Sequence, residues 1–270
     1  SVQLTRSGPV AMFFVRGVGN TSGGTGEEAT NAVYIDGVYV SDMKGTALKF
    51  NNIERIEVLK GPQGTLFGRN SSGGLINVIT KEPGDQAEVD LRLGYANYDT
   101  TTAQAYIAGP LSDTMSADVA LTSTNQAEGW GEQLIDGEDI YKGWDWGIRS
   151  KWVWQPTDTT KISLAGEYGK VSDDHTSTFL LAQGAVGVLG NTAANDDYDS
   201  GANEQMFTTQ DNAALTLTGE IDLGWSTLTS ITGYRDNETE TALDVDTSPV
   251  PLVRININSS TTTFQQELRL

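Results

Sequence analysis

The stretch that decides the fold is RIEVLKGPQGTLFGRNSSGGLINVITK, residues 55–81. β-Branched and other apolar residues at 56–59 and 75–79 flank five glycines and a proline. Such runs are typical of strands, and glycine and proline mark turns, so the pattern predicts a strand, a glycine-rich loop and a second strand. The glycines are expected to permit tight backbone turns. A phosphate site is disfavoured, because the loop lacks the Gly-Lys-Ser/Thr ending of a P-loop.

The residues before this stretch are expected to fold with it into one compact α+β unit. Short β-rich runs occur at 13–16, 32–35 and 38–40. Asp36-Gly37 separates the last two runs, and this dipeptide favours a two-residue hairpin turn in which both residues have positive φ. Residues 43–51 are compatible with a short helix. The unit is therefore predicted to be a small mixed sheet with one or two short helices.

From residue 87 onward, apolar and polar residues alternate with a period of two. The clearest case is 144–155, where one face carries Ile148 and four tryptophans, Trp144, Trp146, Trp152 and Trp154. The other face carries Asp145, Arg149 and Lys151. A core stripe in a soluble sheet is one interpretation. We favour a membrane strand, because tryptophan pairs at both ends of a strand of about ten residues mark the two interfaces of a bilayer.

Eight strands of this kind are predicted, at 87–95, 103–107, 117–121, 144–155, 161–168, 215–223, 227–235 and 264–270. Three connections are tight, at 109–114, 155–160 and 223–226, and three are long, at 125–143, 169–213 and 236–260; the short connection at 96–100 breaks the rule. Short turns at one end and long loops at the other are typical of an outer-membrane β-barrel. The fold class is therefore an α+β unit followed by antiparallel transmembrane barrel strands, dominated by β structure.

Composition excludes several kinds of site. Lys+Arg number 17 against 36 Asp+Glu, a formal net charge of -19, which makes nucleic acid a poor partner. There is no cysteine and one histidine, His175, so disulfides, thiolate metal sites and two-histidine metal motifs are impossible within this sequence. No nucleophile–base or paired-carboxylate pattern stands out. We expect neither an enzyme nor a bound cofactor or metal, although a Ca²⁺ site in the acidic loop 169–213 stays open.

Three blocks resemble, in order and spacing, the plug domain of TonB-dependent outer-membrane receptors. They are Phe14 to Gly19, Val33 to Tyr39, and Ile53 to Lys81. Residues 109–113 and 265–270 also resemble early barrel strands of that family. The resemblance implies residues 1–81 as a partial plug, 82–86 as a linker and 87–270 as the N-terminal part of a transmembrane β-barrel.

What the resemblance implies is an active transporter in the outer membrane of a Gram-negative bacterium, surrounded by lipid. A plug blocks a barrel of about 22 strands. A scarce small-molecule ligand, such as a ferric siderophore or another iron chelate, binds from outside. The TonB–ExbB–ExbD complex supplies energy through a segment missing here. Eight strands alone enclose only side chains, so we interpret the chain as a fragment of a larger receptor.

Candidate site residues fall into three groups. Aromatic residues in the outside loops are expected to contact the ligand: Trp130, Tyr141 and Phe179. Charged residues are expected to form contacts between the plug and the barrel lumen: Arg16, Glu57 and Arg69. The four tryptophans of 144–155 are expected to form the membrane-interface girdle.

Two other functions stay open at this point. One is a passive porin-like or surface-adhesive barrel, against which the plug blocks argue. The other is a soluble β-rich binding module. Energy-dependent uptake separates the transporter from the first, and extraction without detergent would favour the second.

Overall fold

A computed structural model describes residues 2–7, 10–20, 30–41, 51–62, 64, 71–175, 177–178, 180–187, 189–192 and 197–270. Every regular element among these residues is a β-strand. The short helix expected at 43–51 lies outside the described residues, apart from Asn51. Among the described residues, no helix is both long and apolar enough to cross a membrane.

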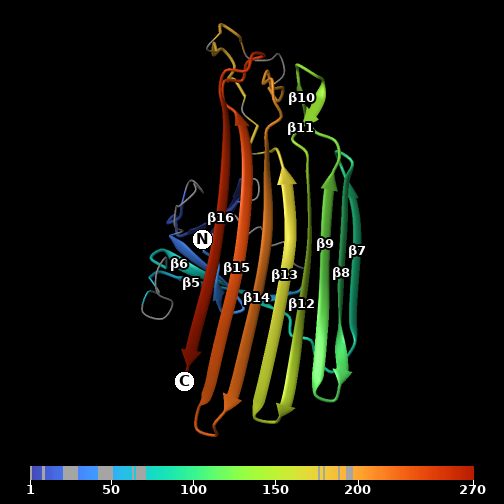
Figure 1. Cartoon of the computed structure of the whole chain (residues 1–270), viewed down its shortest axis with the longest axis vertical. Coiled ribbons are helices and arrows are strands. Elements are labelled where there is room, and N and C mark those ends of the chain that lie inside the picture. Colours follow the sequence, from blue (N-terminus) through green and yellow to red (C-terminus); the bar gives the residue numbers. More distant parts are fainter. Residues whose placement is uncertain are drawn as a thin grey trace.

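The largest element is an antiparallel eight-stranded sheet (Figure 1). Its neighbours follow the order β16-β15-β14-β13-β12-β9-β8-β7. Each strand pairs with the next one of the sheet along the chain, as the hairpin pattern predicts, and all eight expected strands are present. Their bounds are β7 (Glu88–Ala96), β8 (Thr100–Ser112), β9 (Met115–Gln126), β12 (Gly143–Thr157), β13 (Thr160–Asp173), β14 (Phe207–Asp222), β15 (Thr227–Asp244) and β16 (Arg254–Arg269).

The alternation predicted for 144–155 is present in β12. The even-numbered side chains Trp144, Trp146, Ile148, Trp152 and Trp154 are all exposed. The odd-numbered side chains between them are buried: Asp145, Arg149, Lys151 and Val153. Successive side chains point to opposite faces of a strand, so the sheet has one apolar, open face and one face covered by the rest of the chain.

The connections differ in length between the two ends of this sheet. At one end, strands are joined through tight turns near 113–114, 158–159 and 223–226. At the other end lie the segments 127–142, 174–206 and 245–253, and the first of them carries a small hairpin of β10 (Gly131–Gln133) and β11 (Glu138–Ile140). The expected loop 236–260 is wrong in extent. Alternating Thr, Glu, Asn and Ile residues keep β15 and β16 paired through Thr239↔Ser259 to Asp244↔Arg254.

A separate four-stranded sheet has the order β4-β3-β6-β5. It contains β3 (Asn31–Ile35), β4 (Val38–Tyr39), β5 (Ile53–Lys60) and β6 (Gly74–Thr80). β3 and β6 are parallel, and the other two pairs are antiparallel. Before this sheet, β1 (Val2–Ser7) and β2 (Val10–Val15) form a hairpin of their own. The two strands predicted within 55–81 are confirmed as β5 and β6, and residues 63 and 65–70 of the predicted loop lie outside the described residues.

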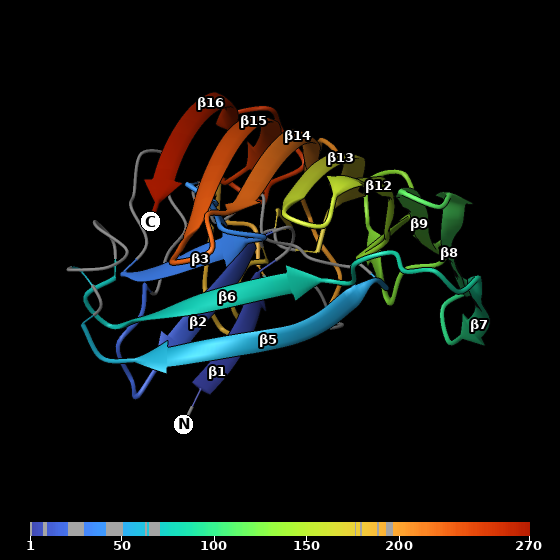
Figure 2. The same ribbon diagram turned by 90° about the horizontal axis from the view of Figure 1, so that it is seen from below.

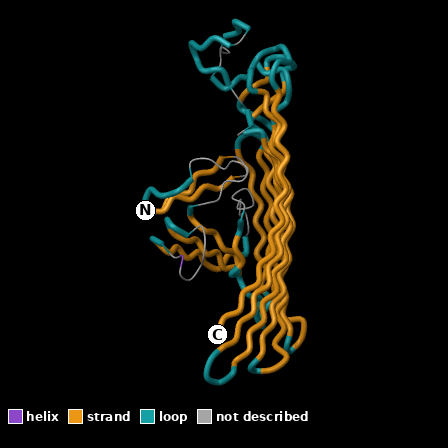
Figure 3. Tube along the Cα trace, turned by 60° about the vertical axis from the view of Figure 1, so that its left-hand side comes forward, coloured by secondary structure: helices purple, strands orange, loops and turns teal. Residues whose placement is uncertain are grey.

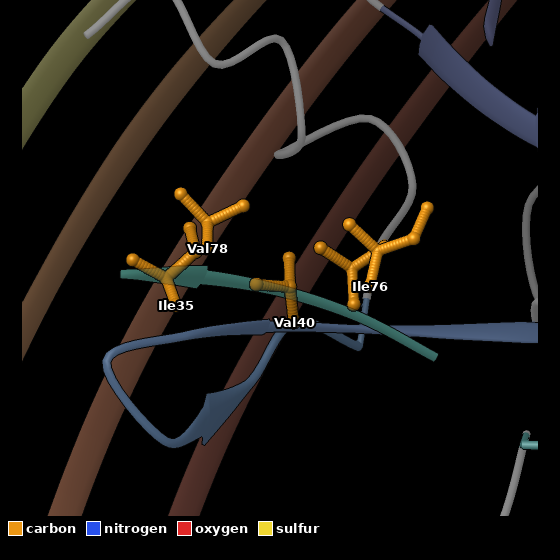
Figure 4. Packing of buried hydrophobic residues seen from close by; sticks show 5 residues of the cluster. Ile35, Val40, Ile76 and Val78 are labelled. Atoms are coloured by element: carbon orange, nitrogen blue, oxygen red, sulfur yellow. The ribbon is translucent and has the colours of Figure 1, made fainter. Parts of the chain in front are cut away.

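The core of the four-stranded sheet is aliphatic. Figure 4 shows Ile35, Val40, Ile76 and Val78 packed together, and Val33 completes this buried cluster. β-Branched side chains suit the pleated surface of a sheet and supply its apolar packing. The four-stranded sheet therefore has a hydrophobic core of its own.

Two positions in this sheet depend on backbone geometry. Asp36 and Gly37 have φ of 48° and 83°, as the predicted two-residue turn requires. At Gly74, a Cβ would lie 2.7 Å from the carbonyl oxygen of Leu59 on the paired strand β5. Both observations support an architectural role for the glycines of this sheet.

The four-stranded sheet lies against the concave face of the eight-stranded sheet (Figure 2). Figure 3 shows it beside the middle of the long strands, away from the long loops. The β3–β4 hairpin points at the wall formed by β12, β13 and β15. This contact brings charged residues of distant segments together.

Candidate functional site

The β3–β4 turn places a carboxylate against two buried cations of β12. The Asp36 Oδ2 atom lies 2.5 Å from Arg149 Nη2 and 3.2 Å from Lys151 Nζ. The side chains of Arg149 and Lys151 are only 3% and 8% exposed. Both residues lie at odd positions of β12, between the outward tryptophans, so the alternation of that strand aims them at the turn.

Further polar groups complete this set, which we call the Asp36 cluster: Asp36, Thr80, Arg149, Lys151, Glu167 and Arg235. Thr80, at the end of β6, donates to Asp36 from its backbone nitrogen at 2.9 Å and from its hydroxyl at 2.7 Å. On the barrel side, Glu167 accepts from Arg149 and, at 2.8 Å, from Arg235 Nη1. The cluster thus joins the β3–β4 turn to β6, β12, β13 and β15.

The cluster keeps Asp36 ionised. Burial alone would raise the pKa of the Asp36 carboxyl, but Arg149, Lys151 and the hydrogen bonds from Thr80 together hold this pKa below its usual value. A depressed folded-state pKa contributes stability at any pH above the unfolded value, and that stability is lost only as the pH falls through the folded value. The contact is therefore intact at neutral pH.

A shape match accompanies these charges. If Gly233 on β15 carried a Cβ, that atom would lie 2.5 Å from Val38 Cγ1 in the hairpin. Only glycine lets the hairpin approach β15 so closely. Gln265 on β16 accepts a hydrogen bond from the Tyr39 backbone nitrogen at 2.8 Å, and Ser41 and Thr263 lie 2.7 Å apart through their hydroxyl oxygens. The hairpin therefore sits in a fitted recess of the wall.

The segment after β6 is fixed to the same wall. Lys81 pairs with Glu88, and its ammonium lies 4.6 Å from the ring centre of Tyr106. Ser116 donates to the Pro83 carbonyl at 2.7 Å. Lys161 pairs with Glu82 at 3.1 Å. Residues 81–88 are thus held at several points where they pass from one sheet to the other.

A second group of side chains gathers at the long-loop end. This outer aromatic cluster consists of Tyr98, Trp130, Tyr141, His175 and Tyr198. Trp130 stacks on Tyr141 with ring centres 5.0 Å apart and planes at 7°, and its centre lies 4.9 Å from that of His175. Tyr98 meets Trp130 edge-on at 5.6 Å, and Tyr198 meets Tyr141 at 6.4 Å. Three separate outer segments are tied together in this way.

Acidic groups lie beside the outer aromatic cluster. A cavity of about 280 Å³ is lined by Glu138, Asp139, Asp173 and Asp174 among others. Burial raises the pKa of Asp174 to about 6, although its carboxylate accepts a hydrogen bond from the backbone nitrogen of Lys142 at 2.7 Å. No three His, Asp or Glu side chains among the described residues are arranged to hold a metal ion.

Two of the three predicted ligand contacts lie in the outer aromatic cluster. Trp130 and Tyr141 come together in the outer aromatic cluster, whereas Phe179 lies outside the described residues. Tyr141 is 7% exposed, so its ring serves mainly to pack against its neighbours. Trp130 is 37% exposed and offers the larger accessible surface. Ligand contact by these residues stays a prediction.

The predicted lumen contacts are not the residues that form the Asp36 cluster. Arg16 is exposed in a turn with φ of 53°. Glu57 pairs with Arg55 at 2.8 Å and accepts from Asn77 at 3.1 Å, all within the four-stranded sheet. Arg69 lies outside the described residues. Barrel contact by these three residues stays a prediction.

Sequence reasoning missed the Asp36 cluster, although its signals were present. The sequence pattern predicts Asp36 in a turn, and Arg149 and Lys151 on the face opposite the tryptophans. Charges on the inward face of a membrane strand need partners, because burying an unpaired charge is costly. The carboxylate of Asp36, in the predicted turn, is such a partner for Arg149 and Lys151.

Known proteins resemble this chain in sequence and in fold. A family model described as the TonB-dependent Receptor Plug Domain matches residues 1–75. The chain is 36% identical over 86 residues to the catecholate siderophore receptor Fiu of Escherichia coli (strain K12), covering 30% of this chain and 11% of that protein. Residues 1–75 therefore belong to the plug-domain family of TonB-dependent receptors. The matched residues run from β1 to the start of β6, and the eight-stranded sheet follows them along the chain.

Other receptors give the same picture. The iron-regulated outer membrane virulence protein of Vibrio cholerae (strain O395) is 36% identical over 94 residues, covering 31% of this chain and 14% of that protein. The ferric yersiniabactin uptake receptor FyuA of Yersinia pestis superposes with a TM-score of 0.79 at 18% identity, covering 99% of this chain and 40% of that one. The ferripyoverdine receptor of Pseudomonas aeruginosa gives 0.73 at 16% identity, covering 99% and 35%. The chain thus spans about two fifths of these solved structures or less.

Proposed function

We propose that this chain supplies the plug and eight barrel strands of an outer-membrane receptor that imports a ferric siderophore with energy from the TonB–ExbB–ExbD complex. In this proposal, residues 1–81 are plug, 82–86 are linker and 87–270 are barrel. The protein binds and moves its ligand without changing it chemically, so it is not an enzyme. It lies in the outer membrane of a Gram-negative bacterium, with lipid against the outward face of β12.

The observation that carries the proposal is the seating of the β3–β4 hairpin on the inner wall through the Asp36 cluster. A plug held inside a barrel by buried ion pairs and a fitted hairpin blocks free diffusion. Moving it requires work against these contacts, since parting buried charges leaves each of them unpaired. Transport past such a plug therefore needs an energy source, which distinguishes an active receptor from a passive porin or an adhesive barrel.

Relatives support the class of ligand. Three of the four are named for a catecholate siderophore, ferric yersiniabactin and ferripyoverdine. These compounds differ from one another but share a chelated iron. We therefore propose a ferric siderophore as the ligand class, with Trp130 as the most accessible of the predicted contacts in the outer aromatic cluster.

The outward tryptophans suit the proposed location. Trp144 and Trp146 lie toward one end of β12, Trp152 and Trp154 toward the other, and all four are exposed. Indole rings prefer the interface between lipid headgroups and hydrocarbon. We propose that these pairs mark the two membrane interfaces, with Ile148 in the apolar band between them.

The test is iron uptake by cells that produce the full-length receptor and lack their own siderophore receptors. Radiolabelled iron is supplied as ferric yersiniabactin, as ferripyoverdine and as a ferric catecholate, with and without a protonophore. The proposal predicts accumulation of at least one complex, abolished by the protonophore and by deletion of the TonB protein. Uptake that persists without a proton gradient would contradict it and favour a passive barrel. Release of the intact protein by buffer alone would favour a soluble module.

A further inference from the structure

A pair of hydrogen bonds joins two of the long outer segments beside the outer aromatic cluster. The Lys142 backbone nitrogen donates to Asp174 Oδ1 at 2.7 Å, and the Asp174 nitrogen donates to the Lys142 carbonyl at 3.3 Å. We call these two bonds the Asp174 clamp. Tyr141 directly precedes one of its residues, and His175 directly follows the other. The clamp therefore sets the separation of these two rings.

Both rings contact Trp130. Tyr141 stacks on Trp130 with ring centres 5.0 Å apart, and the ring centre of His175 lies 4.9 Å from that of Trp130. Because each ring belongs to a residue next to the clamp, loosening the clamp would weaken both contacts. Trp130 is the more exposed of the two predicted ligand contacts in the described residues. Asp174 is thus placed to act as a positioning residue for Trp130.

The Asp174 carboxyl group lies in an acidic setting. His175 Nδ1 is 4.0 Å from Asp174 Oδ1 and 3.6 Å from Asp173 Oδ2. Asp173 and Asp174 also line the cavity of about 280 Å³. Among the described residues, the charged and titratable groups that surround Asp174 from the packed segments are Asp173, His175, Glu138, Asp139, Tyr141, Lys142, Tyr198 and Asp199. Carboxylates outnumber cations in this set.

Protonation of Asp174 strengthens the clamp. Burial, and to a smaller extent the charge of Asp173, raise the pKa of this carboxyl to about 6, although the Lys142 hydrogen bond and His175 act in the opposite direction. An Asp carboxyl in an open segment has a pKa of about 4. The clamped form therefore holds a proton to a higher pH than the open form does. The stability that this proton gives is fully present below about pH 4 and is lost as the pH rises through about 6.

We propose that capture of the ferric siderophore at the outer aromatic cluster is coupled to the binding of one proton by Asp174, so that the ligand binds more tightly at mildly acid pH than at neutral pH. This inference rests on the proposed uptake function and adds the regulation of its first step. One proton changes an equilibrium by at most about tenfold per pH unit. Capture should therefore strengthen by up to about tenfold between pH 7 and pH 5.

The experiment measures binding without uptake. Cells that carry the full-length receptor and lack the TonB protein are given the radiolabelled ferric siderophore that the wild type imports, at about pH 5 and about pH 7. The dissociation constant of the wild type should be lower at the acid pH. Asp174→Asn keeps the size of the side chain and cannot ionise, so it should bind tightly at both pH values. Both receptors are given the same complex, so protonation of the siderophore itself cancels in their ratio. Equal pH dependence in the two receptors would overturn the proposal.

Two control variants show whether the proton belongs to Asp174. Asp139→Asn removes another charge from the same cavity, and His175→Phe keeps a ring against Trp130 that takes no proton. Both should retain the pH dependence of the wild type. Its loss in either control, with retention in Asp174→Asn, would assign the proton to another group and overturn the proposal. A merely structural role for Asp174 would weaken binding by Asp174→Asn equally at both pH values.

A second measurement needs no ligand. The part of the tryptophan fluorescence that Trp130→Phe removes reports on Trp130, and its quenching by acrylamide reports how accessible that ring is. We expect weaker quenching at acid pH than at neutral pH in the wild type, and no such difference in Asp174→Asn. The same quenching in the wild type at both pH values would contradict the role of the clamp.

The two proposals fail in different ways. If the wild-type receptor takes up none of the ferric siderophores, the proposed function is wrong, and the quenching measurement still tests the clamp. If the wild type imports its ligand but binds it equally at both pH values, the uptake function stands and the proton coupling is wrong.

Discussion

The two faces of β12 carry different chemistry on the same backbone. Outward residues such as Trp146, Ile148 and Trp152 are exposed, while inward Arg149 and Lys151 are buried against the plug. In a water-soluble sheet, the apolar face would be the buried one. Here the apolar face is open and the charged face is covered, as expected when lipid surrounds the barrel and a polar plug fills it.

The difference teaches how each face is stabilised. On the outward face, we propose that single side chains are stabilised by contact with lipid, which requires no specific partner. On the inward face, each charge needs a particular partner at hydrogen-bond distance, and the carboxylates of Asp36 and Glu167 lie at that distance from Arg149. Substitutions on the two faces should therefore lower the stability of the protein for different reasons.

The largest effect is expected on the inward face. Arg149→Met removes a buried cation and leaves Asp36 and Glu167 facing each other with less compensation. Breaking a buried pair costs about 3–5 kcal/mol, so the plug should unfold at clearly lower denaturant concentration. Urea unfolding of the full-length receptor in detergent micelles measures this. Arg92→Met is the control, because Arg92 pairs with Asp90 at an exposed site, worth about 0–1 kcal/mol.

A somewhat smaller effect is expected on the outward face. Ile148→Lys places a charge at mid-strand, where an unpaired Lys costs about 2–4 kcal/mol at the bilayer midplane. Refolding into lipid vesicles at a series of denaturant concentrations measures the loss, with Ile148→Val as the conservative control. Equal stability of the Lys and Val variants would show that this face does not meet lipid.

The hairpin recess should show a smaller, local effect. Gly233→Val puts a branched side chain where Val38 sits, and overpacking of this kind costs about 1–3 kcal/mol. Gly219→Val on the adjacent strand β14 is the control, because no atom lies within 4 Å of its added Cβ. Plug unfolding in urea should shift for Gly233→Val alone. A shift of the same size in both variants would mean that strand effects, and not the recess, are measured.

The smallest effect is expected at the long-loop end and depends on pH. Burial raises the pKa of Asp174 to about 6, so the folded loops hold the proton of this carboxyl to a higher pH than the unfolded chain does. A raised folded-state pKa gives stability at low pH that is lost as the pH rises through about 6. Hydrogen exchange in 127–142, corrected for its intrinsic pH dependence, should thus be better protected at low pH. Asp174→Asn should remove this dependence and leave barrel unfolding unchanged.

Much of this architecture was predictable from local patterns. The alternation in 144–155 predicts the two faces of β12, because successive side chains of a strand point to opposite faces. Asp36-Gly37 gave the hairpin because the turn needs positive φ at both residues. The order and spacing of the three plug blocks predict the plug domain of the family.

The contacts between the two sheets were harder to predict. Asp36 and Arg149 are separated by 113 residues, and no local pattern encodes which inward charge meets which turn. Charge alone predicts Glu57 and Arg16 as lumen contacts, and Glu57 pairs with Arg55 and accepts a hydrogen bond from Asn77 within its own sheet. The extent of β15 and β16 was underestimated, because Thr, Asn and Glu continue the pairing where polar composition suggested a loop.

The most direct test of the account is the coupling between Asp36 and Arg149. Asp36→Asn, Arg149→Met and the double variant of the full-length receptor are compared by urea unfolding of the plug. Because the two side chains are in contact, the account predicts a double loss smaller than the sum of the single losses, with a coupling energy of about 1–3 kcal/mol. Additive losses, within about 0.5 kcal/mol, would contradict a plug seated on the barrel wall through this pair.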